Sequence, residues 1–152
     1  MTKGREEGCV PKKCGRKERA MLALTVRNTA KLVREKSKAE NVRLGRLFTK
    51  KDTARLMADM LDIDNEKSVY TVLDAGAGTG ILSAAVIERI CKSSKSCKQI
   101  ILTCYENNPD FLPMLYDNLE RVRKKCRHDY GVKVYSTVYE ENYITEAQHQ
   151  NR

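Results

Sequence analysis

The stretch VYTVLDAGAGTG, residues Val69–Gly80, decides the fold of this chain. Its apolar, β-branched start predicts a strand that ends at Asp74, and the apolar residues of Ile81–Ile90 predict a helix after it. Three glycines lie between strand and helix at alternate positions: Gly76, Gly78 and Gly80. Glycines let the backbone approach a ligand closely, and the N-terminus of the helix directs free N–H groups at that ligand. This order of elements predicts a nucleotide-type cofactor site at the carboxyl edge of an open α/β sheet.

Two more strands are expected after this unit. The run QIILTCY at Gln99–Tyr105 ends at Glu106, and the run VKVYSTVY at Val132–Tyr139 follows a further predicted helix. That helix is expected to start with Asn108 as its cap and to continue to about Cys126. Strand, helix and strand at this spacing form a right-handed βαβ unit. An acid at the end of the second strand can accept both hydroxyls of a ribose, and we predict this role for Glu106.

The glycine spacing distinguishes between classes of cofactor. A dinucleotide fingerprint has the spacing G-x-G-x-x-G, whereas this loop has G-x-G-x-G, which disfavours a nicotinamide-dependent dehydrogenase. The segment D-A-G-A-G-T-G resembles motif I of the S-adenosylmethionine-dependent methyltransferases. The resemblance implies a Rossmann-like fold with S-adenosylmethionine as the cofactor, and it implies cofactor contacts from five residues: Asp74, Ala75, Gly76, Gly78 and Gly80. A tight connection between strand and helix, without a ligand, is the alternative.

A second resemblance precedes the glycine loop. Residues 44–57, L-G-R-L-F-T-K-K-D-T-A-R-L-M, resemble motif X of the adenine-N6 DNA methyltransferases of restriction–modification systems, whose usual form is L-G-x-F-[FY]-T-P. Phe48 and Thr49 match the aromatic residue and the threonine, while Lys50 replaces the proline. The resemblance implies that this segment closes over the cofactor, with Thr49 near the methionine carboxylate. From the residues alone, Thr49 is also a candidate N-cap for a helix over Lys51–Asp62.

The resemblance extends to residues that follow the second and third strands. Glu106 corresponds to the acid of motif II, and Asn107 would lie beside the adenine of the cofactor. Asn142 and Tyr143 occupy the place of the Asp-Phe pair of motif III, where the polar residue meets the adenine amino group and the aromatic residue packs on the ring. An asparagine can accept the same hydrogen bond through its carbonyl oxygen. Plain strand ends are the alternative for these residues.

The catalytic motif of that family, [DNS]-P-P-[YF], does not occur in this sequence. In the family it follows the fourth strand, binds the adenine amino group and stacks on the flipped base. The tetrapeptide at residues 108–111, N-P-D-F, follows the second strand and lacks the second proline, so we do not assign it this role. We predict no catalytic residues here. The chain is expected to be the cofactor-binding part of a DNA adenine-N6 methyltransferase, inactive alone, either as a fragment or with a second chain that supplies the catalytic and target-recognition parts.

Two other functions stay open. The chain is alternatively a non-catalytic DNA-binding or regulatory remnant, or it belongs to a methyltransferase that acts on RNA, protein or a small molecule, because motifs I and II are widely shared. An open sheet of three strands would also expose an apolar edge. We therefore expect the isolated domain either to be marginally stable or to pair with a partner that supplies further strands.

The net charge of +9 is unevenly distributed along the 152 residues. Residues 1–50 hold 15 Lys and Arg against 5 Asp and Glu. We divide the chain into a basic N-terminal arm and helix, residues 1–44 with the helix near 17–40, and a partial methyltransferase domain, residues 45–152. A basic region of this kind suits DNA, whose neutralised phosphates release counterions. A solvated basic helix without a nucleic-acid partner is the alternative.

Six cysteines show no disulfide framework, so we expect free thiols and a cytoplasmic protein. Cys9 and Cys14 have ligand-like spacing but no second pair near them, and a structural zinc site needs four ligands. We therefore expect no metal. No apolar run approaches the roughly 20 residues of a membrane helix, and the N-terminus does not have the pattern of a signal peptide.

Overall fold

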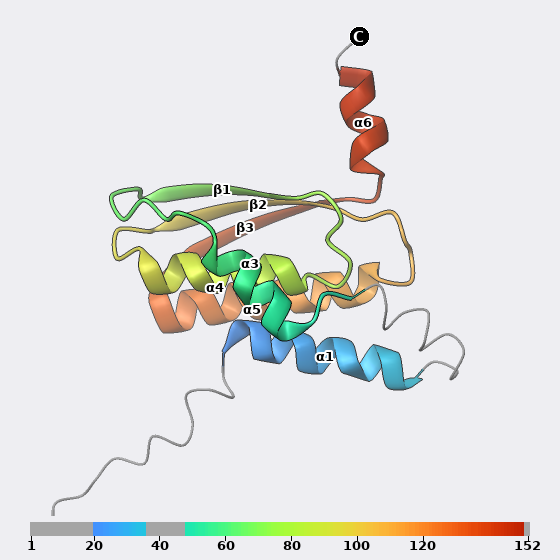
Figure 1. Ribbon diagram of the computed structural model, residues 1–152, viewed down its shortest axis with the longest axis horizontal. Helices are drawn as coiled ribbons and strands as arrows, with labels where there is room; N and C mark the ends of the chain where they lie inside the picture. The colour runs from blue at the N-terminus through green and yellow to red at the C-terminus, as the bar shows by residue number, and fades with distance from the viewer. Residues whose placement is uncertain (1–19, 36–47, 151–152) are drawn as a thin grey trace, which may run out of the picture.

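A computed structural model describes residues 20–35 and 48–150 of the protein (Figure 1). In chain order, its elements are α1 (Met21–Glu35), α3 (Lys51–Asp59), β1 (Val69–Asp74), α4 (Ile81–Ser93), β2 (Gln99–Tyr105), α5 (Leu112–Tyr130), β3 (Lys133–Tyr139) and α6 (Tyr143–Gln150). The predictions for residues 1–19, including Cys9 and Cys14, and for residues 36–47 lie outside the described residues. No helix in the described part of the chain is long and apolar enough to cross a membrane.

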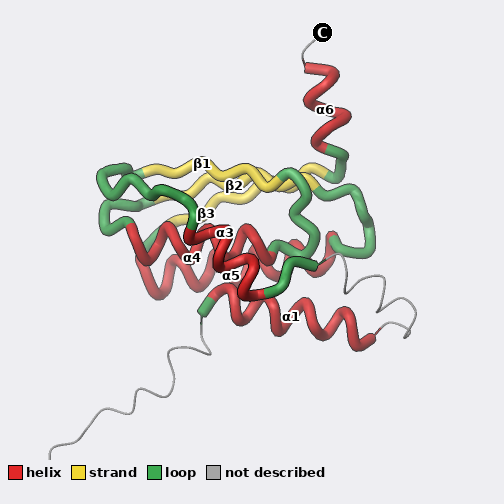
Figure 2. Tube along the Cα trace, in the orientation of Figure 1, coloured by secondary structure: helices red, strands yellow, loops and turns green. Residues whose placement is uncertain are grey.

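The three strands form one parallel sheet in the order β1-β2-β3. The α/β class is therefore confirmed, β2 has the predicted bounds, and β3 begins one residue later than predicted. Both α4 and α5 lie on the same face of the sheet (Figures 1 and 2). The connections β1-α4-β2 and β2-α5-β3 each move one strand further in the same direction across the sheet. Because such connections are right-handed, both place their helix on the same face.

The core lies between the sheet and these two helices. Ile100, Leu102 and Cys104 point from β2 toward the helices and are fully buried. Ile87 of α4 and Leu115 of α5 belong to the same apolar cluster and are fully buried as well. Each helix thus buries one apolar stripe against the sheet, as its amphipathic sequence predicts.

An outer layer of two helices covers α4 and α5. The helix α1 packs across both, and α3 packs along α4. A second apolar cluster joins the three helices of this junction through Leu22, Ala54, Ala58, Ile81 and Ala85. The segment that precedes the sheet is therefore packed against the helix that follows the glycine loop.

The helix α3 differs from its prediction at both ends. It ends at Asp59 rather than Asp62: Met60 is the C-cap, and the Leu61 N–H donates to the carbonyl of Ala58 at 3.2 Å, three residues back, so the helical i→i−4 pattern stops there. The prediction that Thr49 caps the helix is wrong: the N-cap position is held by Lys50, whose side chain makes no capping hydrogen bond.

The helix α5 begins and ends later than predicted. Instead of capping the helix, Asn108 closes a turn in which its Oδ1 accepts the Asp110 N–H at 3.0 Å and its carbonyl accepts the Phe111 N–H at 3.1 Å. Such local bonds compete with helix formation, and the helix starts only at Leu112. It continues past Cys126 to Tyr130, where Gly131 ends it in the left-handed conformation at φ 69°.

The other face of the sheet has no covering layer among the described elements, and we call it the bare face (Figure 2). Large apolar side chains on it are between 38% and 54% exposed: Val69, Leu73, Ile101, Tyr135 and Tyr139. The helix α6 leaves the sheet on this side and projects away from it (Figure 1). The sequence predicted an exposed apolar edge; among the described residues the exposed apolar side chains extend over a whole face of the sheet.

Candidate functional site

The glycine loop bridges the carboxyl ends of β1 and β2. The Ala77 N–H donates to the carbonyl of Tyr105 at 2.9 Å, and the Gly80 N–H donates to the carbonyl of Ala77 at 2.7 Å. The helix α4 then starts at Ile81, with Gly80 as its N-cap at φ 82°. The predicted strand, loop and helix are confirmed, and the loop lies at the sheet edge where open α/β folds bind ligands.

Glu106 connects the glycine loop to the loop after β2. Its Oε2 accepts the N–H of Gly78 at 2.7 Å, and its Oε1 accepts the N–H of Asn108 at 2.8 Å. The residue is 9% exposed. A carboxylate oxygen has two lone pairs, so each oxygen keeps the capacity to accept one more hydrogen bond. The structure thus brings the two predicted acids of the site to the same edge, one at each strand end.

Asp74 is oriented by a side chain that the sequence did not single out. Its Oδ2 accepts a hydrogen bond from the Ser83 hydroxyl at 2.5 Å, and the same hydroxyl lies 3.8 Å from the Cys104 sulfur. Burial and the nearby charge of Asp74 raise the pKa of the Cys104 thiol to about 12, although the contact with Ser83 acts in the opposite direction. The Cys104 thiol is therefore neutral beside the Asp74 side chain at the end of β1.

The backbone conformation and packing require glycine at two of the three glycine positions of the loop. Gly80 is required because its φ is positive and because a Cβ would lie 3.1 Å from Leu115 Cδ1. Gly78 has a positive φ of 54°. Gly76 has neither constraint: its φ lies outside the left-handed region, and a Cβ there would meet nothing within 4 Å. The fold of the chain therefore accounts for two glycines and leaves the third facing open space.

A buried network of hydrogen bonds connects the glycine loop to α1 and α5. Thr79 is 1% exposed, its hydroxyl accepts from Thr29 of α1 at 2.9 Å, and its carbonyl accepts from Asn118 of α5 at 2.8 Å. The Asn118 side chain also accepts from Asn28 of α1 at 2.8 Å. This network was missed in the sequence, where the only signal is that polar residues interrupt the apolar face of α1. It fixes the loop between two helices that are far apart in the chain.

The segment that resembles motif X is brought to the same region. The ring of Phe48 lies 5.0 Å from the ring of Phe111, which follows the loop after β2. Phe48 also packs against the apolar cluster that contains Ile81, the first residue of α4. Thr49 is half-buried beside it, and its predicted role toward a ligand stays a prediction.

The remaining predicted residues lie at the same sheet edge but apart from the loop. Asn107 is exposed, and Asn142 Oδ1 caps α6 by accepting the N–H of Ile144 at 3.0 Å. Tyr143 packs edge-on against Tyr105 at 5.1 Å. Their predicted contacts with an adenine stay predictions. Ala75 is exposed in the glycine loop, and its predicted contact with the cofactor also stays a prediction.

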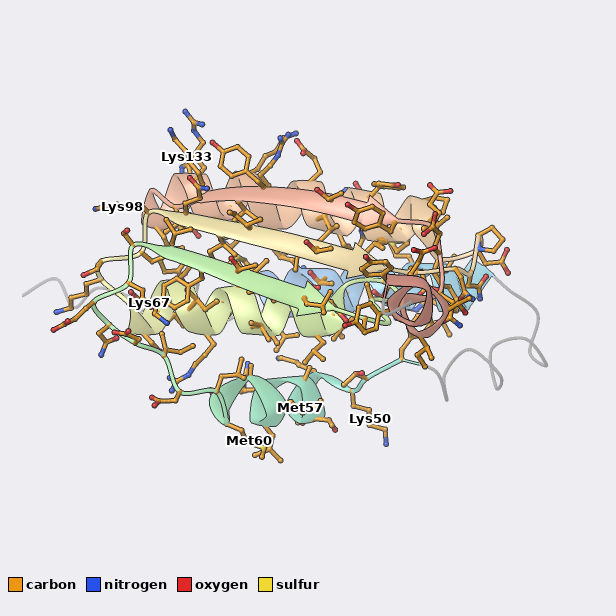
Figure 3. The ribbon with its side chains drawn as sticks, turned by 90° about the horizontal axis from the view of Figure 1, so that it is seen from above. Lys50, Met57, Met60, Lys67, Lys98 and Lys133 are labelled. Carbon is orange, nitrogen blue, oxygen red and sulfur yellow. The ribbon has the colours of Figure 1, made fainter. Side chains whose placement is uncertain are left out.

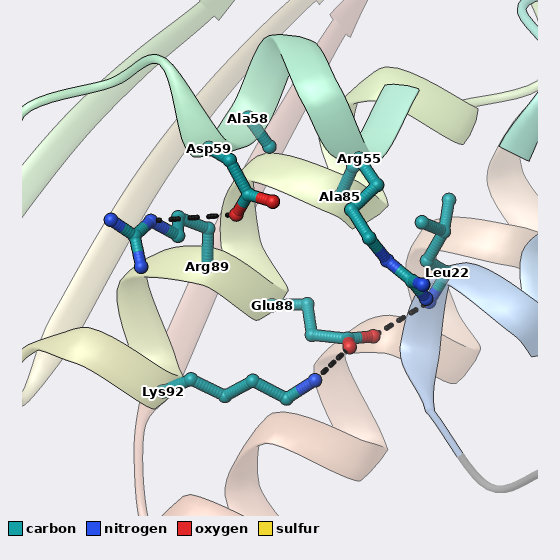
Figure 4. A pocket seen from close by; sticks show the side chains of 8 residues that line it. All are labelled: Leu22, Arg55, Ala58, Asp59, Ala85, Glu88, Arg89 and Lys92. Carbon is teal, nitrogen blue, oxygen red and sulfur yellow. Dashed lines mark hydrogen bonds and ion pairs between the residues drawn. The ribbon is translucent and has the colours of Figure 1, made fainter. Parts of the chain in front are cut away.

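A pocket of about 150 Å³ lies elsewhere, between α1, α3 and α4 (Figure 4). Within it, Glu88 is 6% exposed, its Oε2 accepts the N–H of Leu22 at 3.0 Å, and its Oε1 accepts from Lys92. A second pair joins Arg89 to Asp59 at 3.8 Å. Glu88 lies two helical turns beyond the glycine loop along α4, so this pocket is separate from the candidate cofactor site.

No family model, no curated protein and no solved structure matches this chain. Across the residues that the structure describes, no group of three or more His, Cys, Asp and Glu side chains is placed to hold a metal ion.

Proposed function

We propose that this chain is the S-adenosylmethionine-binding part of a DNA adenine-N6 methyltransferase. One observation carries the proposal. Two nearly buried carboxylates, Asp74 and Glu106, flank a glycine loop at the carboxyl ends of adjacent parallel strands, and Gly76 in that loop faces open space. A glycine that the fold itself does not require is the position where a ligand would approach the backbone.

The residues present fit such a cofactor. Glu106 would accept the ribose hydroxyls with its remaining lone pairs, while the Gly78 N–H and Asn108 N–H keep the carboxylate in place. Asp74 would face the amino group of the methionine part. The cofactor supplies an activated methyl group when bound. The chain's own residues would hold and orient it, since methyl transfer depends mainly on positioning the acceptor nitrogen in line with the methyl group.

The bare face and the free edge of β1 suggest how the acceptor part would join. Ligand crevices in open α/β sheets form at the point where the strand order reverses. Here the order β1-β2-β3 runs one way from β1, so the reversal would need a strand on the free edge of β1. A right-handed crossover to that position places its helix on the bare face. We expect the catalytic and target-recognition parts on a polypeptide that pairs there.

Calorimetric titration with S-adenosylhomocysteine tests the cofactor site. We expect saturable binding by the chain, and loss of binding in Asp74→Ala/Glu106→Ala. Gly76→Leu is the sharper variant, because its side chain would fill only the space left for the ligand and should leave the unfolding midpoint unchanged.

Gly131→Ala is the matched control. It introduces a side chain at a positive φ of 69°, outside the site, so it should lower stability by about 1 kcal/mol and leave binding intact. Absence of binding by a folded chain would overturn the cofactor assignment. It would favour the alternative of a DNA-binding or regulatory remnant, which predicts salt-sensitive DNA binding without any cofactor.

A further inference from the structure

The edge of the sheet opposite the glycine loop carries a row of lysines. Lys95 and Lys98 lie in the connection from α4 to β2, and Lys133 is the first residue of β3. All three are exposed. Figure 3 looks onto the bare face and shows Lys98 and Lys133 at this end of the sheet, with Lys50 at the other end. We call the three residues the amino-edge lysines.

Backbone pairing brings Lys98 and Lys133 together, and Lys95 precedes Lys98 by three residues in the same connection. The Lys133 N–H donates to the carbonyl of Lys98 at 3.0 Å, and the Lys98 N–H donates to the carbonyl of Ser68 at 2.8 Å. Neighbouring strands lie about 4.8 Å apart. The lysine side chains therefore leave the sheet from adjacent points and form a local concentration of positive charge.

These charges are not neutralised within the described residues. The basic residues of α5 are paired along their own helix: Arg121 with Asp117, Arg123 and Lys124 with Glu120, and Lys125 with Asp129. None of the amino-edge lysines has an ion pair of this kind in the parts of the chain that the structure describes. Acids on both sides of this edge already have basic partners: Lys67 pairs with Asp64 before β1 at 4.0 Å, and Asp129 near the end of α5 pairs with Lys125 and His128. The row is limited to the β2 and β3 side of the edge.

The strand-end segments of the carboxyl edge have the opposite charge, and the cations nearest to them in the described chain, Lys50 and Lys51, belong to the start of α3. The segments that leave the three strands, residues 74–80, 106–111 and 140–146, contain acids and no Lys or Arg. A polyanion that meets this chain alone would therefore be attracted to the amino edge more strongly than to the strand-end segments of the carboxyl edge.

We propose that the amino-edge lysines bind the phosphate backbone of a nucleic acid. This contact goes beyond the proposed function. It rests on that function in one respect, the choice of a nucleic acid over other polyanions. It lies one strand length, roughly 20 Å, from the glycine loop. The contact therefore anchors the nucleic acid and does not present a base to the methyl donor.

The test is titration of a fluorescent 20-base-pair duplex with the full chain across a range of salt concentrations. Lys98→Glu/Lys133→Glu should weaken binding about tenfold and lower the slope of log affinity against log salt by about two, since each lost phosphate contact removes close to one unit. Lys50→Glu/Lys51→Glu changes the net charge equally at the other end and should have a much smaller effect. Lys95→Gln/Lys98→Gln is a milder pair that keeps the test valid if the charge reversal disturbs folding.

Equal losses in the two charge-reversed variants, or no loss in either, would overturn the proposal. Binding of polyglutamate as tightly as of the duplex would overturn the assignment to nucleic acid. The same Lys98→Glu/Lys133→Glu protein should bind S-adenosylhomocysteine like the unmodified chain. Failure of the cofactor site and failure of the anchoring contact are therefore separate results.

Discussion

The two faces of the sheet have similar apolar side chains and opposite surroundings. On the covered face, Ile100 and Leu102 of β2 are 0% exposed beneath α4 and α5. On the bare face, Ile101 lies between them in sequence and is 38% exposed, and its register partner Tyr135 is 54% exposed. Strands of a parallel sheet that is buried on both faces are apolar throughout. The comparison shows that these strands suit two covering layers, of which the described residues supply one.

Polar residues on the bare face do not change this interpretation. In register, Thr71 lies beside Ile101 and Tyr135, while Leu73 lies beside Thr103 and Thr137. No charged residue separates the apolar side chains within these two rows. Contiguous apolar patches on soluble proteins commonly mark interaction sites, in agreement with the proposed second layer.

The largest difference between the faces is expected from truncating neighbouring residues of β2. Leu102→Ala should lower the free energy of unfolding by about 2–5 kcal/mol, because it opens a cavity in the core. Ile101→Ala should lower it by less than about 1 kcal/mol, because much of the side chain is already in water. Urea unfolding followed by circular dichroism measures both.

An equal loss in the two variants would contradict a bare face in solution. It would mean that Ile101 is covered, for example by a second copy of the chain. Sedimentation velocity at several concentrations separates these cases, because a covered Ile101 would then be accompanied by concentration-dependent association.

An intermediate effect is expected from detaching α1, the outer layer of the covered side. Glu88→Ala removes the acceptor of the Leu22 N–H and the partner of Lys92, so it should cost about 1–3 kcal/mol. Glu88→Gln keeps an acceptor oxygen for Leu22 and should recover part of the loss. If Glu88→Ala were as stable as the unmodified chain, Glu88 would not be the residue that holds the start of α1.

The sequence predicted the sheet well because its signals are local. Apolar, β-branched runs and strand-end acids placed β1, β2, β3, Asp74 and Glu106 to within a residue. Helix ends were less predictable, because they depend on competition between turn and helix. Because Asn108 forms a turn, α5 begins later than predicted, and the N-cap of α3 is Lys50 instead of Thr49.

Contacts between distant segments were not predictable from one sequence. Leu22 and Glu88 are 66 residues apart, and Thr29 and Thr79 are 50 residues apart. Such pairs leave no local spacing to recognise, although they decide how α1 supports the glycine loop. That the described elements cover only one face of the sheet also became visible only from the placement of the helices.

A last difference between the faces is a pH dependence that belongs to the covered face. Burial raises the pKa of the Cys104 thiol from its ordinary value of 9.0 to about 12. Below pH 9 the thiol keeps its proton in both the folded and the unfolded chain, so it does not affect stability. Above pH 9 only the unfolded chain loses this proton, which stabilises the unfolded state by up to about 1.4 kcal/mol per pH unit. The free energy of unfolding should therefore fall between pH 9 and pH 10.5, and it should fall less steeply in Cys104→Ala.

Thr103→Ala, on the bare side of the same strand, is the control and should keep the full slope. Identical slopes in the unmodified chain and Cys104→Ala would show that the covered face does not seal this thiol from water.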